Sequence, residues 1–174
     1  MGEMILTKER DPRLITVRRG GSLTDEDHRL LALWAAECTL HVLPFFERER
    51  PGDDRPRQAL ELMYGWVRGE VKMSESRNAA FVANAAAREV TGAAREAAHA
   101  AGQAAAVPHV AAHELGAAAY GIRAARAAAG PDERDAAGRT ERDWQRAQLP
   151  DAIRGLVLDD QRIRNEACWR LFEG

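Results

Sequence analysis

Apolar residues recur at spacings of three and four over most of the chain after residue 24. Ser22 or Thr24 can cap a helix at this point, and the acidic residues that follow favour the positive N-terminal end of a helix. Pro51-Gly52 ends the pattern. It therefore predicts a helix over about 24–48. Its apolar face would carry Leu31, Trp34, Cys38, His41 and Phe45.

The same periodicity predicts further helices down to the C-terminus. Asp53 or Asp54 can cap the next one, with Pro56 in its first turn, where a missing N–H group costs little. Pro108 marks a later break, because proline disfavours helix at the residue before it. A short helix carries Ile153 and Val157. The other predicted helices cover about 75–90, 92–106, 108–129, 132–148 and, at the end, 160–172.

The first 22 residues show a different pattern. Met4–Thr7 and Leu14–Val17 are short β-prone runs, separated by the turn signal Asp11-Pro12. A small hairpin and a loose arm both fit this pattern, since an isolated hairpin is marginally stable in water. We therefore divide the chain into an N-terminal arm or hairpin, 1–22, and one helical domain, 23–174.

Alanine makes up about a fifth of the chain, and the segment from Ser74 to Ala129 is roughly half alanine or glycine. Alanine favours helix, and small residues on buried faces let helix axes approach closely. Larger apolar residues interrupt the segment and argue against an exposed coil. The expected fold is all-α, a compact bundle of about six to seven helices. The predicted core contains Trp34, Cys38, Phe45, Leu60, Met63, Phe81, Val110, Tyr120, Trp144 and Leu156.

Charge and composition narrow the classes of function. The net charge of the 174 residues is −2, without a block rich in lysine or arginine, which disfavours nucleic-acid binding. We recognise no apolar run near the roughly 18 residues that span a bilayer, and no secretion signal in Met1–Arg10. Cys38 and Cys168 lie far apart among apolar neighbours, which predicts buried free thiols. We expect a cytoplasmic protein without a membrane partner.

His109 and His113 form the most suggestive local pattern. Two histidines four residues apart share a helix face, which suits a shared metal ion. A zinc site needs a third ligand, and neither His99 nor Glu114 is evidently aimed at the same point. We therefore expect the two histidines to be partly buried and hydrogen-bonded across helices, with no metal and no cofactor.

Other polar residues have a structural and a functional interpretation. His41 lies on the apolar stripe with Glu37 one turn away, which favours a structural histidine over a catalytic one. Cys38 lacks the electropositive setting that activates a thiol. Asp54 and Arg55 belong to a charge cluster that fits capping and surface ion pairs better than recognition. Phosphate loops, nucleophile elbows and nuclease-type carboxylate sets were not found, so an enzyme is disfavoured.

Several stretches are similar to a known family. They are Arg18–Thr24, Asp27–Cys38, Asp53–Arg57, Ala101–Ala104 with His109, Val110 and His113, and Trp144-Gln145 with Leu149, Pro150 and Arg154. Together they resemble a group of bacterial proteins, widespread in actinobacteria, that are labelled putative immunity proteins. The resemblance covers nearly the whole chain from residue 18. Its recurring polar positions are His28, Asp54, Arg55, His109 and His113.

The resemblance implies a cytoplasmic protein that binds and neutralises a cognate toxin, without catalytic residues of its own. Such a protein should present an exposed patch. The alternative is an enzyme or small-molecule-binding protein of bacterial secondary metabolism, with an enclosed pocket. A third interpretation is a homodimer that uses an alanine-rich helix face. The pocket of the alternative would be lined by Glu37, His41, His109, His113 and Tyr120.

Overall fold

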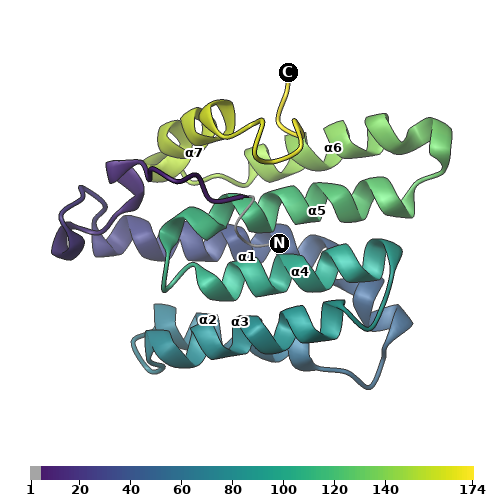
Figure 1. Ribbon diagram of the computed structural model, residues 1–174, viewed down its shortest axis with the longest axis horizontal. Helices are drawn as coiled ribbons and strands as arrows, with labels where there is room; N and C mark the ends of the chain where they lie inside the picture. The colour runs from purple at the N-terminus through teal and green to yellow at the C-terminus, as the bar shows by residue number, and fades with distance from the viewer. Residues whose placement is uncertain (1–4) are drawn as a thin grey trace.

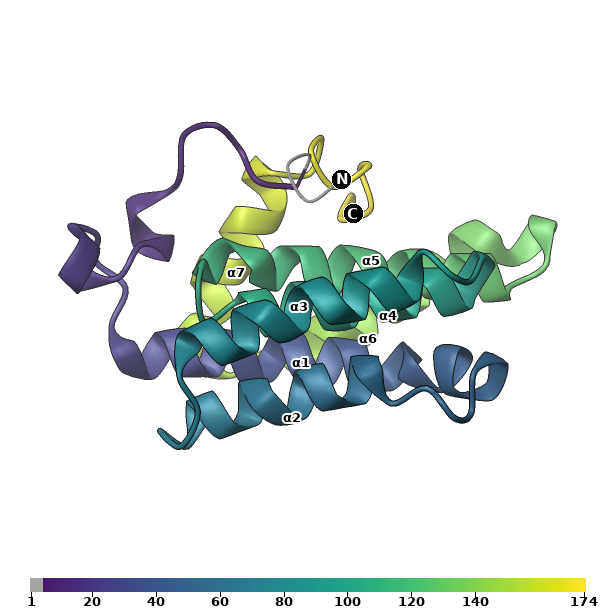
Figure 2. The same ribbon diagram turned by 60° about the horizontal axis from the view of Figure 1, so that its bottom comes forward.

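The computed structural model describes residues 5–174, and this part of the chain contains seven α-helices and no strand. This confirms the predicted all-α bundle (Figure 1). Most helices lie along the long axis of the molecule, whereas α7 is tilted across them (Figure 2). The helices are α1 (Asp25–Glu49), α2 (Arg55–Val67), α3 (Met73–Ala87), α4 (Gly92–Ala106), α5 (Glu114–Ala128), α6 (Arg134–Ala147) and α7 (Asp151–Ile163).

Helix α4 lies at the centre of the bundle, where it packs against α1, α3 and α5. Its small side chains permit this position. A Cβ atom added at Gly102 would lie 2.5 Å from Oδ1 of Asn84 on α3, and one added at Gly116 of α5 would lie 2.2 Å from Oε1 of Gln103. The alanine-rich segment therefore forms a close-packed interior, as its composition predicts.

Half of the predicted core residues are fully buried, namely Trp34, Cys38, Leu60, Met63 and Tyr120. Phe45, Val110 and Leu156 are half-buried and pack against the same core, and Trp144 is also half-buried. The prediction for Phe81 is wrong, because its side chain is 61% exposed. Helix α3 buries Ala80 and Ala83 instead, and the guanidinium of Arg77 lies 5.8 Å from the exposed ring.

Helix α1 is long and apolar enough to cross a membrane by length and composition alone. Its most apolar 18-residue window has a mean hydropathy of 1.3, so the prediction that no run approaches this length is wrong. In the bundle, 56% of this window is buried against neighbouring helices. The apolar character of α1 thus accords with its place in the protein core.

Residues 5–24 form an arm that contains no strand, which corresponds to the arm of the two alternatives that the sequence left open. Met4, in the first β-prone run, lies outside the described residues. The arm contains two short 3₁₀ turns, η2 (Pro12–Leu14) and η3 (Val17–Arg19), and a single bridge joins Thr16 to Leu23. Gly21 packs so tightly that an added Cβ atom would lie 2.0 Å from the carbonyl oxygen of Ile15. The chain therefore folds back as a compact loop.

Two predicted helices have different bounds. The helix expected over 108–129 begins at Glu114, after the 3₁₀ turn η4 (Ala111–His113). The prediction of a helix over 160–172 is wrong, because α7 ends at Ile163 and the chain continues as turns. Trp169 and Arg170 adopt left-handed backbone angles, with φ of 55° and 59°, which interrupt any helix.

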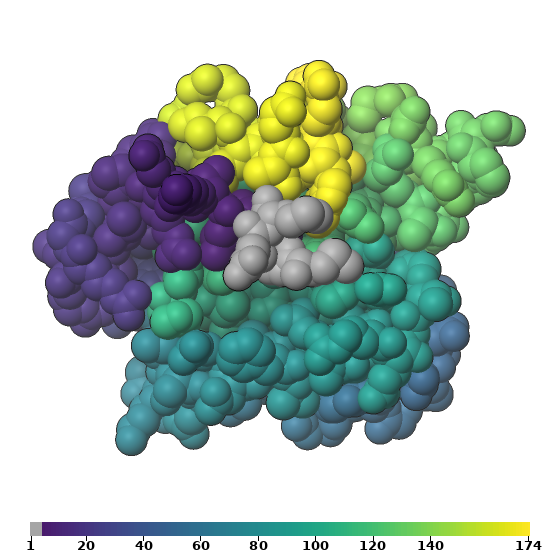
Figure 3. Space-filling view, in the orientation of Figure 1, coloured from purple at the N-terminus to yellow at the C-terminus, as the bar shows by residue number. Residues whose placement is uncertain are grey.

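The C-terminal segment turns back onto the bundle beside the arm (Figure 3). Arg146 of α6 donates to the carbonyl oxygens of Phe172 and Gly174, at 2.8 Å and 2.7 Å. The guanidinium of Arg164 donates to the carbonyl oxygen of Ile5, 3.1 Å away. These long-range bonds hold both ends of the described chain against the helices.

Candidate functional site

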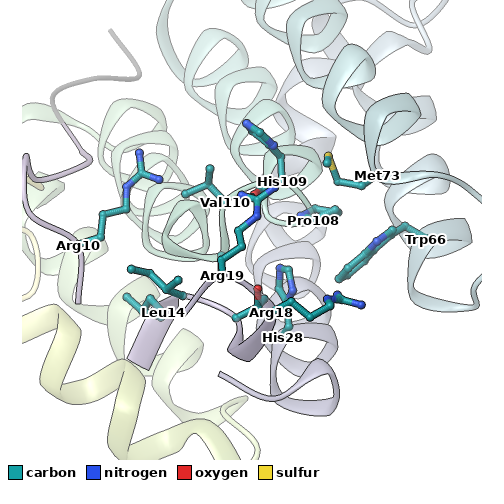
Figure 4. A pocket seen from close by; sticks show the side chains of 13 residues that line it. Arg10, Leu14, Arg18, Arg19, His28, Trp66, Met73, Pro108, His109 and Val110 are labelled. Atoms are coloured by element: carbon teal, nitrogen blue, oxygen red, sulfur yellow. The ribbon is translucent and has the colours of Figure 1, made fainter. Parts of the chain in front are cut away.

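A pocket of about 440 Å³ lies at the end of the bundle where the arm meets the helices (Figure 4). Four segments far apart in sequence enclose it: the arm, the start of α1, the α2–α3 connection and the α4–α5 connection. Arg10 and Arg19 lie on the side of the arm, and Trp66 and Met73 lie across from them.

The arm holds its arginines through a tight glycine loop. Gly20 has a φ of +91°, a conformation that favours glycine, and it ends η3 directly after Arg18 and Arg19. Arg18 pairs with Asp25 at 3.0 Å, and Nη1 of Arg19 donates to the carbonyl oxygen of His109 at 3.4 Å. The arm is thus tied both to α1 and to the α4–α5 connection.

His28, in the first turn of α1, forms a rigid part of the wall. Its Nε2–H group donates to the carbonyl oxygen of Val107 at 2.7 Å, and its ring meets Trp66 edge-on with 4.8 Å between centroids. Burial lowers the pKa of His28, whose side chain is only 4% exposed. The neutral tautomer therefore carries its proton on Nε2 and leaves Nδ1 as an acceptor.

The pKa of His109 is affected by the positive charge around the pocket. Burial lowers its pKa, and the charges of Arg77, Arg19 and Arg10 lower it further. Its Nδ1 atom is buried and has no hydrogen-bond partner within residues 5–174. Among residues 5–174, the pocket lining contains three arginines and no carboxylate. The site can therefore accept an anionic group, beside an apolar part formed by Leu14, Trp66, Met73, Pro108 and Val110.

The predicted pairing of His109 and His113 on one helix face is wrong. His109 precedes η4, and His113 is the last residue of that turn. Nδ1 of His113 donates to Oε1 of Gln103 at 2.8 Å, so this ring is engaged with α4. Among residues 5–174, no group of three His, Cys, Asp or Glu side chains is placed to hold a metal ion.

His41 also has a different partner from the predicted one. Its Nδ1 donates to Glu141 of α6 at 2.9 Å, and its ring stacks on Trp144 with 3.7 Å between centroids. Glu37 is exposed on α1. The thiol of Cys38 is fully buried, and burial raises its pKa, which does not suit a nucleophile. The two cysteines are buried free thiols, as predicted.

The remaining predicted site residues lie elsewhere. Arg55 binds Asp53 and Glu89, both at 2.6 Å, which ties the start of α2 to the α3–α4 connection. Asp54 precedes α2 but accepts from the side chain of Gln58 instead of capping the backbone. Tyr120 is buried on α5, its ring 5.4 Å from that of Trp169. The structure places His109 in the same pocket as His28, whereas the other predicted site residues lie outside this pocket.

Sequence reasoning missed most of the pocket. Arg10, Trp66 and Met73 belong to segments with no local signal of a shared site. Arg18 and Arg19 were noticed only within a family resemblance. The adjacent Gly20-Gly21 pair was the available signal, since it permits a sharp turn that brings the neighbouring arginines against the bundle.

An all-α bundle with an open cationic pocket is a scaffold suited to binding. The sequence model described as "Imm-5 like putative immunity protein" matches residues 21–152 of the chain. The chain therefore belongs to this family. The match includes His28, Trp66 and Pro108–Ala111 of the pocket and leaves out Arg10–Arg19 of the arm. Neither a curated protein nor a solved structure matches the chain.

Proposed function

We propose that this chain is an immunity protein that neutralises a cognate toxin by binding it. The observation that carries the proposal is the family match over residues 21–152. Protection by binding requires a folded surface complementary to the toxin and no chemistry of its own. A specific complex of this kind buries about 800 Å² on each partner.

The arrangement of the histidines supports binding over catalysis. His28, His99 and His113 each donate a hydrogen bond to an internal acceptor. Glu37, His41, His113 and Tyr120 do not line one pocket with His109, so the catalytic set considered from sequence is not assembled. The histidines contribute to the scaffold, and the exposed arginines of the arm are available to a partner.

We further propose that the protein acts in the cytoplasm of the cell that it protects. Cys38 and Cys168 are buried free thiols. Burial raises the pKa of Cys168 to about 12, which keeps it protonated and unreactive. Free thiols are typical of reducing compartments.

The test uses a candidate toxin domain, identified by sequencing the genes beside the one for this chain. Co-expression with this domain should restore cell growth, and isothermal titration with the two purified proteins should give a saturable complex. Normal growth inhibition despite soluble immunity protein, with no heat of binding, would contradict the proposal. Light scattering of the free protein and the complex would also settle whether the chain acts as a monomer or a homodimer.

A second candidate function is binding of a small anionic metabolite in the same pocket. The volume of about 440 Å³ falls within the range typical of small-molecule sites, about 300–1,000 Å³. A thermal-shift screen with dicarboxylates and phosphate esters tests it. A rise in Tm that disappears when Arg19 is replaced by glutamine would support this function, and a flat response to every compound would exclude those ligands.

A further inference from the structure

We propose that the cationic pocket receives an acidic segment of the toxin, with a carboxylate beside Arg10 and Arg19 and an apolar neighbour against Trp66 and Met73. This inference rests on the proposed function and names the chemistry of the contact. It assigns a role to side chains of the arm that are not engaged in the core.

The first argument is the positive charge of the pocket lining. The chain as a whole carries a net charge of −2, yet the part of the pocket lining formed by residues 5–174 contains Arg10, Arg18 and Arg19 and no carboxylate. Asp25 pairs with Arg18, whereas Arg10 and Arg19 have no carboxylate partner among residues 5–174. Unpaired like charges held together favour an incoming anion.

The second argument is the apolar part of the same pocket. Trp66 packs edge-on against the buried ring of His28, and His28 is fixed by Val107. The ring of Trp66 is therefore held in place before any partner arrives, which reduces the entropy lost on binding. Tryptophan and arginine are the residues that most often dominate the energy of protein interfaces.

The third argument is an exposed apolar side chain on the arm, next in sequence to residues that line the pocket. Val17 lies on η3 next to Arg18 and is 62% exposed, so this apolar side chain has little role in the core. An exposed valine in the same short turn as Arg19 suits a partner surface in which apolar and acidic side chains alternate. A polynucleotide would instead require a longer track of positive charge to follow its phosphates.

The experiment measures the affinity of the neighbouring-gene toxin domain for matched charge variants. The test variant is Arg10→Glu with Arg19→Glu. The control variant is Arg134→Glu with Arg139→Glu, which makes the same change in net charge on α6. The start of this helix lies at the other end of the molecule from the arm (Figure 1). Arg134 and Arg139 are exposed and have no ion pair within residues 5–174.

Replacement of a single interface arginine at a hot spot typically weakens binding by about thirty-fold or more. We expect the test variant to lose at least this much affinity and the control variant to stay within threefold of the wild type. Hydrogen exchange should show protection of residues 10–28 and 107–111 when the toxin domain binds. The neutral variant Arg10→Gln with Arg19→Gln should lose affinity too, which guards against a folding defect of the glutamate variant.

The outcomes separate this inference from the proposed function. A wild-type protein that fails to bind the toxin domain would overturn both. Wild-type binding that the test variants leave unchanged would overturn the inference alone, as would equal losses in the test and control variants. Stabilisation by inorganic phosphate or by a short oligonucleotide that depends on Arg10 and Arg19, with unchanged toxin affinity, would also overturn it in favour of a free anion or a nucleic acid.

Discussion

The imidazole of His28 donates from Nε2 to the carbonyl oxygen of Val107, 2.7 Å away. This bond joins the first turn of α1 to the end of α4, 79 residues later in the chain. It also fixes one wall of the cationic pocket, because Trp66 packs edge-on against the same ring. The shape of the pocket is thus set by the contact between the two central helices.

Trp34 should be among the strongest single contributors to stability. Its side chain is almost fully buried, and its indole N–H group donates to the carbonyl oxygen of Gln145 on α6 at 2.9 Å. We expect Trp34→Ala to lower the free energy of unfolding by about 3–5 kcal/mol, measured by urea denaturation. The matched control Phe81→Ala removes an exposed ring and should change it by less than about 0.5 kcal/mol. Equal losses would contradict the burial pattern.

Two helical glycines provide a test of the close packing. Gly116→Ala would place a methyl group against Oε1 of Gln103, which cannot move away without breaking its bond to His113. We expect this change to lower the free energy of unfolding by about 1–3 kcal/mol. Gly155 of α7 has open space around it. Gly155→Ala should therefore raise the free energy of unfolding by up to about 1 kcal/mol through better helix propensity. Tm should rise with it, and a fall in Tm would argue against this helix.

A buried ionic cluster joins α5 to α7. Arg164 lies 2.5 Å from Asp160 and 3.4 Å from Glu114, and all three side chains are buried. Burial raises the pKa of Glu114 well above its usual value, and the charge of Asp160 adds to the effect. Burial thus favours the neutral form of Glu114, beside the close pair of Asp160 and Arg164.

This arrangement predicts unequal costs for two substitutions. Arg164→Met leaves a buried carboxylate without its partner and should lower the free energy of unfolding by about 3–5 kcal/mol. Glu114→Gln keeps the shape of the side chain and removes only a charge that burial disfavours, so it should cost less than about 1 kcal/mol. Guanidinium denaturation at pH 7 measures both. A larger loss for Glu114→Gln than for Arg164→Met would show that Glu114 carries a charge.

Stability should fall as the pH is lowered from 7 toward 4. Burial lowers the pKa of His99 and of His113 to about 4, below the unfolded value of 6.5. Between these values the unfolded chain binds more protons than the folded one. Each histidine therefore lowers the free energy of unfolding by on the order of 1.4 kcal/mol for each unit by which the pH falls in this range. In the variant His99→Gln with His113→Gln, the free energy of unfolding, measured by urea denaturation, should fall less between pH 7 and pH 5 than in the wild type. A decline as steep as that of the wild type would assign the effect to other groups.

Divalent metal ions should leave the protein unaffected. His113 uses Nδ1 to bind Gln103, and His109 belongs to the pocket instead of the same helix face. We expect elemental analysis to find no stoichiometric zinc, and Tm to change by less than about 1 °C when zinc or a chelator is added. Bound zinc that is lost in the variant His109→Ala with His113→Ala would contradict this prediction and favour a metal-dependent activity.

The sequence by itself determined most of the helical segments and showed that small residues let them pack closely. The stripe containing Trp34 and Cys38 predicted α1 and its buried face, because periodicity and propensity are local properties of the chain. The sequence did not show that Phe81 faces solvent or that the chain turns back after Ile163. A helical spacing indicates an amphipathic face but not whether another element covers it.

Only the tertiary structure decided how the site is composed. His41 pairs with Glu141, 100 residues away, and the pocket joins arginines of the arm to His28, Trp66 and His109. Such neighbours are brought together by the packing of several helices, and the free energy of that packing is spread over many contacts. No short pattern in the chain records it. The helices are therefore largely a local property of this sequence, and the cationic pocket is a property of the whole fold.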